Sequence, residues 1–221
     1  RRNAFVDELS RALKARGVTV PAKLDKDWDY NGSVGLPIKK NRVWWFSSFR
    51  NWGYNNFAPN TFYADGRQGV DDNLIQAYTN RGTVQINSRN KFTAMYDKLP
   101  KFRGHRNIET GTVDPNAAVV QKTPLAYNGQ AKWTSTVSNK LLIEAGYSTN
   151  YYNYSLHYEP EVAGPSAAKP YGDISHLDLI TNRLSVAAQM DFRDWFMKRN
   201  VVSSVSYVTG SHAFKTGIQY G

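Results

Sequence analysis

The residues that could carry chemistry in this chain are its histidines and its scattered carboxylates. The histidines are His105, His157, His176 and His212. They form no ligand-spaced pair, and neither an HExxH motif nor a cysteine accompanies them. The Asp71-Asp72 pair and the stretch from Asp173 to Asp178 could offer carboxylates to a calcium ion in an exposed loop, but the spacing of an EF-hand is absent. The sequence predicts no metal site and no cofactor, and only calcium binding by a loop stays open.

Nucleophilic catalysis has equally little support. The chain contains no cysteine, which removes a thiolate nucleophile, a thiolate metal site and a disulfide framework. Serine, histidine and aspartate are plentiful, yet no Gly-x-Ser-x-Gly nucleophile elbow occurs. We therefore expect a protein that is not an enzyme.

One short segment interleaves basic and aromatic residues in a way that suits an anionic partner. It runs Lys-Phe-Arg-Gly-His-Arg from 101 to 106, a composition found where proteins contact nucleic acid or anionic sugars. The net charge is +10, but the 28 Lys and Arg residues are spread along the chain without a block, which disfavours nucleic acid. In a membrane barrel these residues would form a loop that contacts a ligand or the phosphates of lipopolysaccharide: Lys101, Arg103, His105 and Arg106. A solvated loop without a partner is the alternative.

The composition excludes a helical membrane protein and leaves a β-barrel open. Runs such as Val43–Phe46 and Ala117–Val120 are far shorter than the roughly 20 apolar residues of a spanning helix. A membrane strand needs only about 10 residues with one apolar face. Aromatic residues make up 14% of the chain and often stand beside Asn, Ser, Thr and Gly, as at a membrane–water interface.

Four very short polar turns, each between two extended stretches, organise the chain after residue 27. They are predicted at Leu36–Asn41, Asn87–Asn90, Ser138–Asn139 and Thr209–His212. The arms that follow the last three turns alternate between apolar and polar residues with period 2. The first hairpin, Trp28–Val34 with Arg42–Trp52, carries aromatics on both phases, so its alternation assigns no face. We predict an all-β fold of about eight antiparallel strands in four hairpins.

The alternation divides the strand residues into two sets. The polar phase, predicted to face a lumen, contains Arg81, Lys91, Lys132, Glu144 and Lys215. The apolar phase, predicted to face lipid, contains Phe92, Tyr96, Leu141, Ile143, Tyr147, Phe214 and Ile218. A Lys or Arg facing lipid near the midplane would cost about 2–4 kcal/mol, which is why the charged phase is placed inside.

Long connections separate the hairpins, roughly over residues 55–78, 99–129 and 158–198. Long loops are uncommon in compact domains, whereas membrane barrels have short turns on one side and long loops on the other.

Before the hairpins, Phe5, Leu9 and Leu13 predict a short helix within residues 1–17, ended by Gly17.

Two adjacent stretches resemble a known family. Asp29–Ile38, which contains Asn-Gly-Ser-Val-Gly-Leu-Pro-Ile, is followed by Arg42–Arg50, Arg-Val-Trp-Trp-Phe-Ser-Ser-Phe-Arg. Together they resemble an early barrel hairpin of Oar-like TonB-dependent receptors, with Leu36 where that family usually has glycine. Residues 101–106 and Gly210–Gly217 are also similar to stretches of these receptors, so the resemblance extends from about Ala15 to Gly221.

This resemblance implies a 22-stranded outer-membrane barrel that is closed by a plug and imports large or scarce substrates with energy relayed by TonB. Neither a plug nor a TonB-coupling box is recognisable, so we expect residues 1–221 to be an internal fragment of the barrel domain. The implied location is the bacterial outer membrane. The implied partners are lipid, lipopolysaccharide, the rest of the barrel and plug, and the TonB system, without nucleic acid. Two alternatives remain: a small closed barrel with a structural or adhesive role, and a soluble β-rich module that binds acidic ligands.

Overall fold

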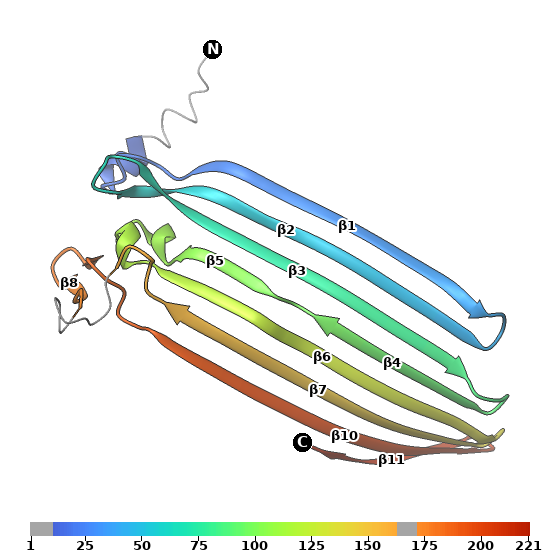
Figure 1. Ribbon diagram of the computed structural model, residues 1–221. Helices are drawn as coiled ribbons and strands as arrows, with labels where there is room; N and C mark the ends of the chain where they lie inside the picture. The colour runs from blue at the N-terminus through green and yellow to red at the C-terminus, as the bar shows by residue number, and fades with distance from the viewer. Residues whose placement is uncertain (1–10, 163–171) are drawn as a thin grey trace.

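The computed structural model describes residues 11–162 and 172–221, which belong mostly to one large antiparallel sheet (Figure 1). Its strands are β1 (Lys23–Lys39), β2 (Val43–Phe62), β3 (Gln68–Gln85), β4 (Asn90–Lys98), β5 (Lys101–Arg106), β6 (Val119–Ser138), β7 (Leu141–His157), β10 (Phe192–Thr209) and β11 (His212–Tyr220). Two 3-10 helices, η1 (Ile108–Thr110) and η2 (Pro115–Ala117), and a small hairpin of β8 (His176–Asp178) and β9 (Arg183–Ser185) lie outside this sheet. The all-β prediction is therefore confirmed, as one antiparallel sheet of long strands.

The sheet has eight strand positions, because β4 and β5 share one of them. Both strands pair with β3 on one side and with β6 on the other. The break between them falls at Leu99-Pro100, where proline offers no N–H to the ladder. Hydrogen bonding continues across the break, since Leu99 N–H donates to the Ala126 carbonyl and Gln76 N–H donates to the Pro100 carbonyl. The four predicted hairpins are β1–β2, β3–β4, β6–β7 and β10–β11.

Each of the four short turns lies at or next to its predicted position. Residues 40–42, 86–89, 139–140 and 210–211 connect the hairpin strands. Asn41 (φ 58°) and Gly210 (φ 54°) adopt the left-handed backbone that tight turns require. In the second turn the Asn87 side chain accepts hydrogen bonds from the N–H groups of Arg89 and Asn90. The first turn begins later than predicted, because β1 continues to Lys39.

The prediction of long loops was wrong for most of residues 55–78 and 99–129, whereas the described part of 158–198 is mainly loop. Residues 55–78 form the outer parts of β2 and β3, which are connected by only residues 63–67. Residues 99–129 contain β5, both 3-10 helices and the first half of β6. Within the described part of 158–198, β8, β9 and the start of β10 are present. The apolar–polar alternation did not reveal these strand ends for two reasons. They pack against the segments between the strands, and they carry bulges between Phe57 and Phe62 and between Arg103 and Arg106.

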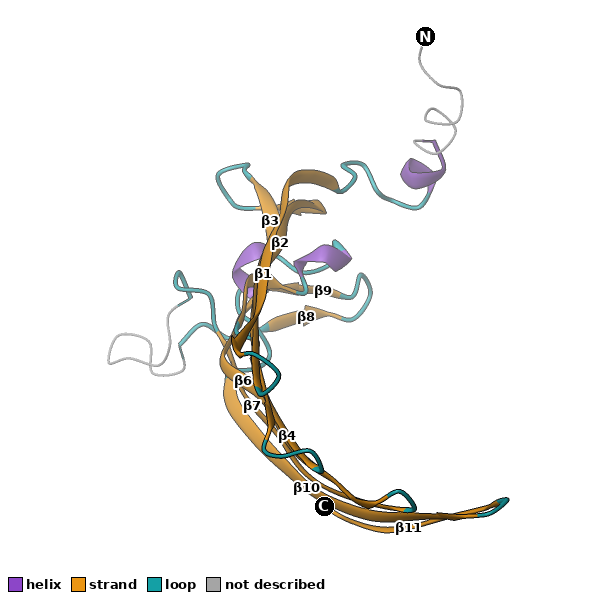
Figure 2. Ribbon diagram, turned by 90° about the vertical axis from the view of Figure 1, so that its right-hand side faces the viewer, coloured by secondary structure: helices purple, strands orange, loops and turns teal. Residues whose placement is uncertain are grey.

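Seen along its strands, the sheet is strongly curved, and β8 and β9 lie on the inner side of the curve (Figure 2). The strand order is β1-β2-β3-β4-β6-β7-β10-β11, so β1 and β11 are the two edges within the described chain. These edges do not pair with each other. The sheet is thus an open, curved wall.

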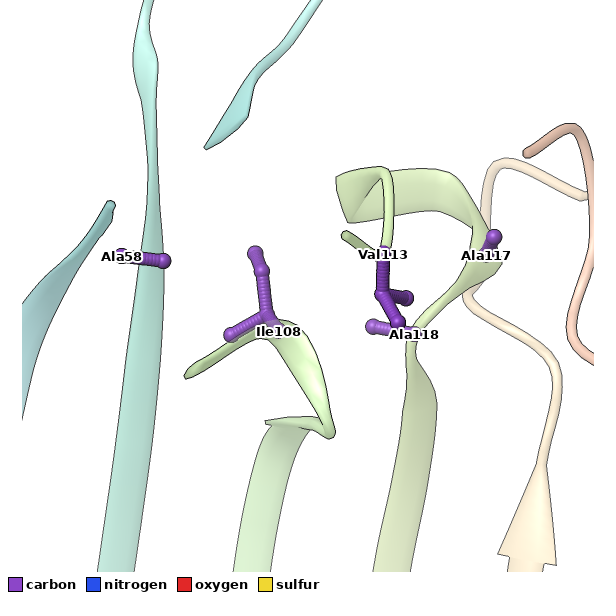
Figure 3. Packing of buried hydrophobic residues seen from close by; sticks show 5 residues of the cluster. All are labelled: Ala58, Ile108, Val113, Ala117 and Ala118. Carbon is purple, nitrogen blue, oxygen red and sulfur yellow. The ribbon is translucent and has the colours of Figure 1, made fainter. Parts of the chain in front are cut away.

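The buried hydrophobic residues gather near the end of the sheet opposite the short turns. One cluster contains Ala58, Ile108, Val113, Ala117 and Ala118 (Figure 3). A second contains Val119, Leu156 and Ala188. We call this region the loop end: residues 54–73, 101–123, 153–162 and 172–191. The opposite half of the sheet, from about Tyr151 on β7 to the short turns, is called the turn half.

The predicted N-terminal helix lies largely outside the described residues. Residues 11–15 are helical, and Gly17 follows with φ 82°, which is the left-handed conformation predicted for it. The Asn60 side chain holds this segment, donating to the Gly17 carbonyl and accepting from Thr19 N–H. The first strand begins at Lys23, slightly before the predicted start at residue 27.

Candidate functional site

The strand register assigns each side chain of the sheet to one of two faces. In an antiparallel ladder, paired residues share a face and successive residues alternate. The pairs of Lys132 with Thr93 and of Glu144 with Thr134 therefore connect one face across β4, β6 and β7. This face carries all the charged candidates: Arg81, Lys91, Lys132, Glu144 and Lys215. The opposite face carries all the apolar candidates: Phe92, Tyr96, Leu141, Ile143, Tyr147, Phe214 and Ile218.

The charged face is the concave one. Ile108 of η1 packs against Gly69, which alternates with Asp71 on this face of β3. The segment after η1 is bridged to β9 by Val113 and Leu184, and β9 lies inside the curve of the sheet (Figure 2). We call this concave surface the inner face and the convex surface the outer face.

Three of the predicted inner-face residues form an ion-pair chain across three strands. Lys132 Nζ lies 2.6 Å from Glu144 Oε1, and Lys215 Nζ lies 3.6 Å from Glu144 Oε2. The lysine side chains are more than half exposed, so each contact contributes only about 0–1 kcal/mol. These contacts contribute little to stability, but they show that the three side chains meet on the inner face.

An aromatic row crosses the outer face at the border of the turn half. The ring centroids of Phe49 and Tyr78 are 5.1 Å apart. Those of Tyr96 and Tyr127 are 5.6 Å apart, and Tyr127 stacks on Tyr151 at 5.4 Å. Cross-strand aromatic pairs of this kind stabilise neighbouring strands. These five residues are the aromatic row.

Between the aromatic row and the residues next to the turns, the outer face is almost free of charge. Its large side chains include Trp45, Val84, Phe92, Trp133, Ile143, Tyr147, Val201, Val205 and Ile218, all at least partly exposed. Asp, Glu and Lys are absent from this area of the described strands. The one arginine, Arg199, stands at the border of this area. Its Nε lies 3.1 Å from the Met197 sulfur, so its side chain is directed away from the short turns. We call this surface the apolar band.

The basic segment 101–106 is strand β5, not the loop that was predicted. It fills the gap between β3 and β6, and Arg103 pairs with Asn73 on one side and Gln121 on the other. Lys101 and Arg103 therefore belong to the inner face. The bulge between Arg103 and Arg106 turns His105 to the other face.

Arg103 is the centre of a buried ion-pair network. Its Nε and one terminal nitrogen donate to the two Asp71 carboxylate oxygens at 2.8 and 2.9 Å, and it lies 3.0 Å from Glu109. The Arg103 and Asp71 side chains are only 15% and 5% exposed. Tyr54 adds a hydroxyl donor to Asp71 at 3.3 Å. This two-point geometry fixes β5 against β3 and connects η1 to both.

His105 forms a second network with Asp72. Its Nδ1 and its backbone N–H lie 2.8 and 3.0 Å from the same Asp72 oxygen, and its Nε2 lies 2.9 Å from the Tyr63 hydroxyl and 3.8 Å from Glu159. The Asp72 carboxylate occupies the space beside Gly104 that a Cβ atom would fill. Because adjacent strand residues alternate, Asp71 and Asp72 serve opposite faces, so they do not form one calcium site.

The electrostatics of this second network are set by burial. Burial lowers the pKa of His105, but the Asp72 hydrogen bond and the Glu159 charge outweigh it, so the pKa is raised. Burial also raises the pKa of Glu159 to about 7, against the opposing charge of His105. Glu159 is 4% exposed, and its Oε1 has no hydrogen-bond partner. The pKa values of both groups are therefore shifted upward, towards the protonated forms.

A hollow of about 390 Å³ opens on the inner face beside β5. Its walls are Lys101, Arg103, Arg106, Gln121, Tyr152 and Tyr154. Three of the four predicted ligand contacts are thus brought together, whereas His105 is directed elsewhere. Sequence reasoning missed the two tyrosines and Gln121. Part of the information was in the sequence, because Tyr152 and Tyr154 follow Glu144, Ser148 and Asn150 at every second position of β7 and so lie on the same inner face.

The other histidines make no common site. His157 Nδ1 lies 3.1 Å from Asp191, His176 is on β8, and His212 stands beside Phe214 next to the fourth turn. Among residues 11–162 and 172–221, no group of three His, Cys, Asp or Glu side chains could hold a metal ion. In those same residues, no helix has the length and apolar character needed to cross a membrane.

No family model matches this chain, and no match was found among curated proteins or solved structures.

Proposed function

We propose that this sheet is part of the wall of a bacterial outer-membrane β-barrel, with its outer face in lipid and its inner face towards a polar lumen. The observation that carries the proposal is the distribution of charge over the turn half. The inner face there holds Arg81, Lys91, Lys132, Glu144 and Lys215, while the apolar band directly behind them has no charge away from its border. A sheet in water would gain nothing by exposing so large an apolar surface.

The height and slant of the apolar band support the same proposal. On β7 it runs from Leu141 to Tyr151, which matches the roughly 9–11 residues that a tilted membrane strand requires. The aromatic row marks its upper border, where membrane barrels carry an aromatic girdle. Val43 lies beside the first turn, and its paired residues can be followed from strand to strand across the sheet as far as Ser203 on β10. Ser203 is six residues from Thr209, where β10 ends at the fourth turn. The turns are thus staggered, as in tilted barrel strands.

The open edges indicate that the wall needs further strands. In lipid every unpaired backbone N–H or C=O costs several kcal/mol, and β1 and β11 each leave one side unpaired within the described chain. Within this proposal the barrel is that of an Oar-like TonB-dependent receptor. The support is the resemblance carried by Asp29–Ile38 and Arg42–Arg50, which form the part of the β1–β2 hairpin next to its turn. The remaining barrel and the plug would supply the missing partners.

Cysteine labelling at two adjacent positions tests the membrane assignment. The chain has no cysteine of its own, so Ile143→Cys and Leu142→Cys each give one label at neighbouring aliphatic residues on opposite faces. With spin labels in bilayers, we expect position 143 to be accessible to oxygen and position 142 to a water-soluble paramagnet. The reverse pattern, or a stable monomer in detergent-free buffer, would overturn the proposal and favour a soluble binding module.

The receptor assignment has a separate test in cells. We expect a strain without this gene and a strain without TonB to lose growth on the same large substrates from a panel of polymers. A growth defect that does not depend on TonB would contradict the receptor assignment and leave the barrel assignment intact.

A further inference from the structure

The inner-face hollow beside β5 has a composition that no structural role in the sheet explains. It places two tyrosine rings and a glutamine amide next to three basic side chains. It lies beyond the aromatic row, in the part of the chain that the proposed barrel would hold outside the lipid. A ligand entering from that side would meet this surface first.

The charge of the hollow is only partly compensated. Arg103 is fully engaged, since it holds both oxygens of Asp71 and also contacts Glu109. Among residues 11–162 and 172–221, the side chains of Lys101 and Arg106 have no hydrogen-bonded or ion-paired partner. Lys101 is nonetheless half-buried, and burial together with the charges of Arg103 and Arg106 lowers its pKa. Two like charges that face one hollow, with no carboxylate bonded to either of them, are an arrangement that an oxyanion would stabilise.

The tyrosines that complete the hollow are held in place by their neighbours. Tyr152 stacks on Phe196 with centroids 5.4 Å apart, and its hydroxyl lies 3.3 Å from the Thr123 hydroxyl. Tyr154 contacts Tyr152 at 5.2 Å and Phe192 at 5.7 Å. Rings fixed in this way offer ring surfaces and hydroxyl groups at little cost in side-chain entropy.

We propose that this hollow binds an anionic saccharide, with the oxyanion held by Lys101 and Arg106 and the sugar ring beside Tyr152 and Tyr154. The cations recognise the charge, the ring faces accept the C–H surface of the sugar, and Gln121 offers an amide to its hydroxyls. A hollow of about 390 Å³ is in the range of small-ligand sites. That such a sugar would be transported rests on the proposed function; its binding does not.

Two sources of the oxyanion are distinguishable by the choice of probe. A uronic acid carries it as a carboxylate on the sugar ring, whereas lipopolysaccharide carries it as phosphate on a lipid-anchored sugar. The probes are therefore digalacturonate, the neutral disaccharide galactobiose, inorganic phosphate and lipopolysaccharide micelles. We expect digalacturonate to bind at least about 10-fold more tightly than galactobiose or phosphate.

The test measures binding by calorimetry on the protein in lipid nanodiscs, with variants that remove one cation each. Lys101→Gln and Arg106→Gln should each weaken digalacturonate binding by about 10-fold, because each removes one charge-assisted contact. Lys122→Gln is the matched control, since Lys122 of β6 pairs with Phe102 of β5 and so stands on the outer face. Its affinity should equal that of the unaltered protein.

Several outcomes would overturn the inference. They are equal binding of galactobiose, unchanged binding in both cation variants, equal weakening by Lys122→Gln, binding of inorganic phosphate alone, or binding of neither digalacturonate nor lipopolysaccharide. Binding of lipopolysaccharide without digalacturonate would support the site and assign its oxyanion to a sugar phosphate. Quenching of the outer-face tryptophans, which include Trp45 and Trp133, by brominated lipid in the same nanodiscs reports insertion separately. Lost binding with intact quenching overturns only this inference, whereas lost quenching overturns the proposed barrel.

Discussion

The turn half and the loop end of this sheet are stabilised in different ways. In the turn half, regular ladders and alternating faces dominate, and the large outer side chains are not buried by the protein itself. At the loop end, bulges, 3-10 helices and two small clusters bury Ile108 and Leu156, and ion pairs such as Arg103–Asp71 are nearly enclosed. The turn half thus depends on its surroundings for burial, whereas the loop end supplies its own burial. Mutations should therefore act by different mechanisms in the two regions.

Breaking the buried ion pair at the loop end should have the largest effect. Asp71→Asn leaves the enclosed Arg103 guanidinium with only the partly exposed Glu109 as a counter-charge, which costs about 3 kcal/mol of unfolding free energy. Asp65→Asn is the control, because the Asp65–Arg67 pair is 52% and 74% exposed, so solvent screens it and its loss should change stability little. Urea titrations in lipid, followed by tryptophan fluorescence, measure both. Equal losses would mean that the loop end is not stabilised by enclosure.

The pH dependence of stability should also belong to the loop end. The pKa of Glu159 is raised to about 7 from 4.5, so the folded state holds this proton over a range in which the unfolded chain has lost it. Its contribution to stability is therefore lost as pH rises towards 7. The pKa of His105 is also raised, so its stabilising contribution is complete below the unfolded pKa and lost as pH rises through its folded pKa. Both effects have the same sign.

We expect the free energy of unfolding to fall by on the order of 1–3 kcal/mol between about pH 5 and pH 8. Glu159→Gln should flatten this dependence, because it removes one titrating group and the charge that supports the other. Urea titrations at several pH values provide the measurement. A free energy that rises over this interval, or a Glu159→Gln variant with an unchanged slope, would show that this network does not control the pH response.

Removing one ring from the aromatic row should have the smallest effect. Tyr127 contacts Tyr96 and Tyr151 on either side, so Tyr127→Leu should cost about 1 kcal/mol beyond the loss of buried area. Tyr207→Leu, at an outer-face tyrosine near the fourth turn, is the matched control and should cost less. The same urea titration separates them. A larger loss at Tyr207 would mean that the row does not connect the strands.

The sequence by itself determined the regular half of the molecule. The alternation from Leu141 to Tyr147 assigned β7 to two faces, and the Asn87–Asn90 and Thr209–His212 turns positioned their hairpins. This succeeded because the period of 2 and the turn residues are local properties, set by backbone geometry and by which side chains tolerate it. The first hairpin was different, since aromatics occupy both phases. Only its pairing with β3 assigned Trp28 and Tyr30 to the outer face.

The tertiary structure alone decided the loop end and the hollow. Arg103 and Asp71 lie 32 positions apart in the chain, and nothing near either residue indicates its partner. The bulge between Arg103 and Arg106 interrupts the two-residue alternation of faces, and a strand prediction from sequence depends on that alternation. Tyr152 reaches the hollow only because β7 pairs with β6 and β6 pairs with β5. Contacts of this kind depend on long-range pairing and burial, which a local pattern of residue types does not encode.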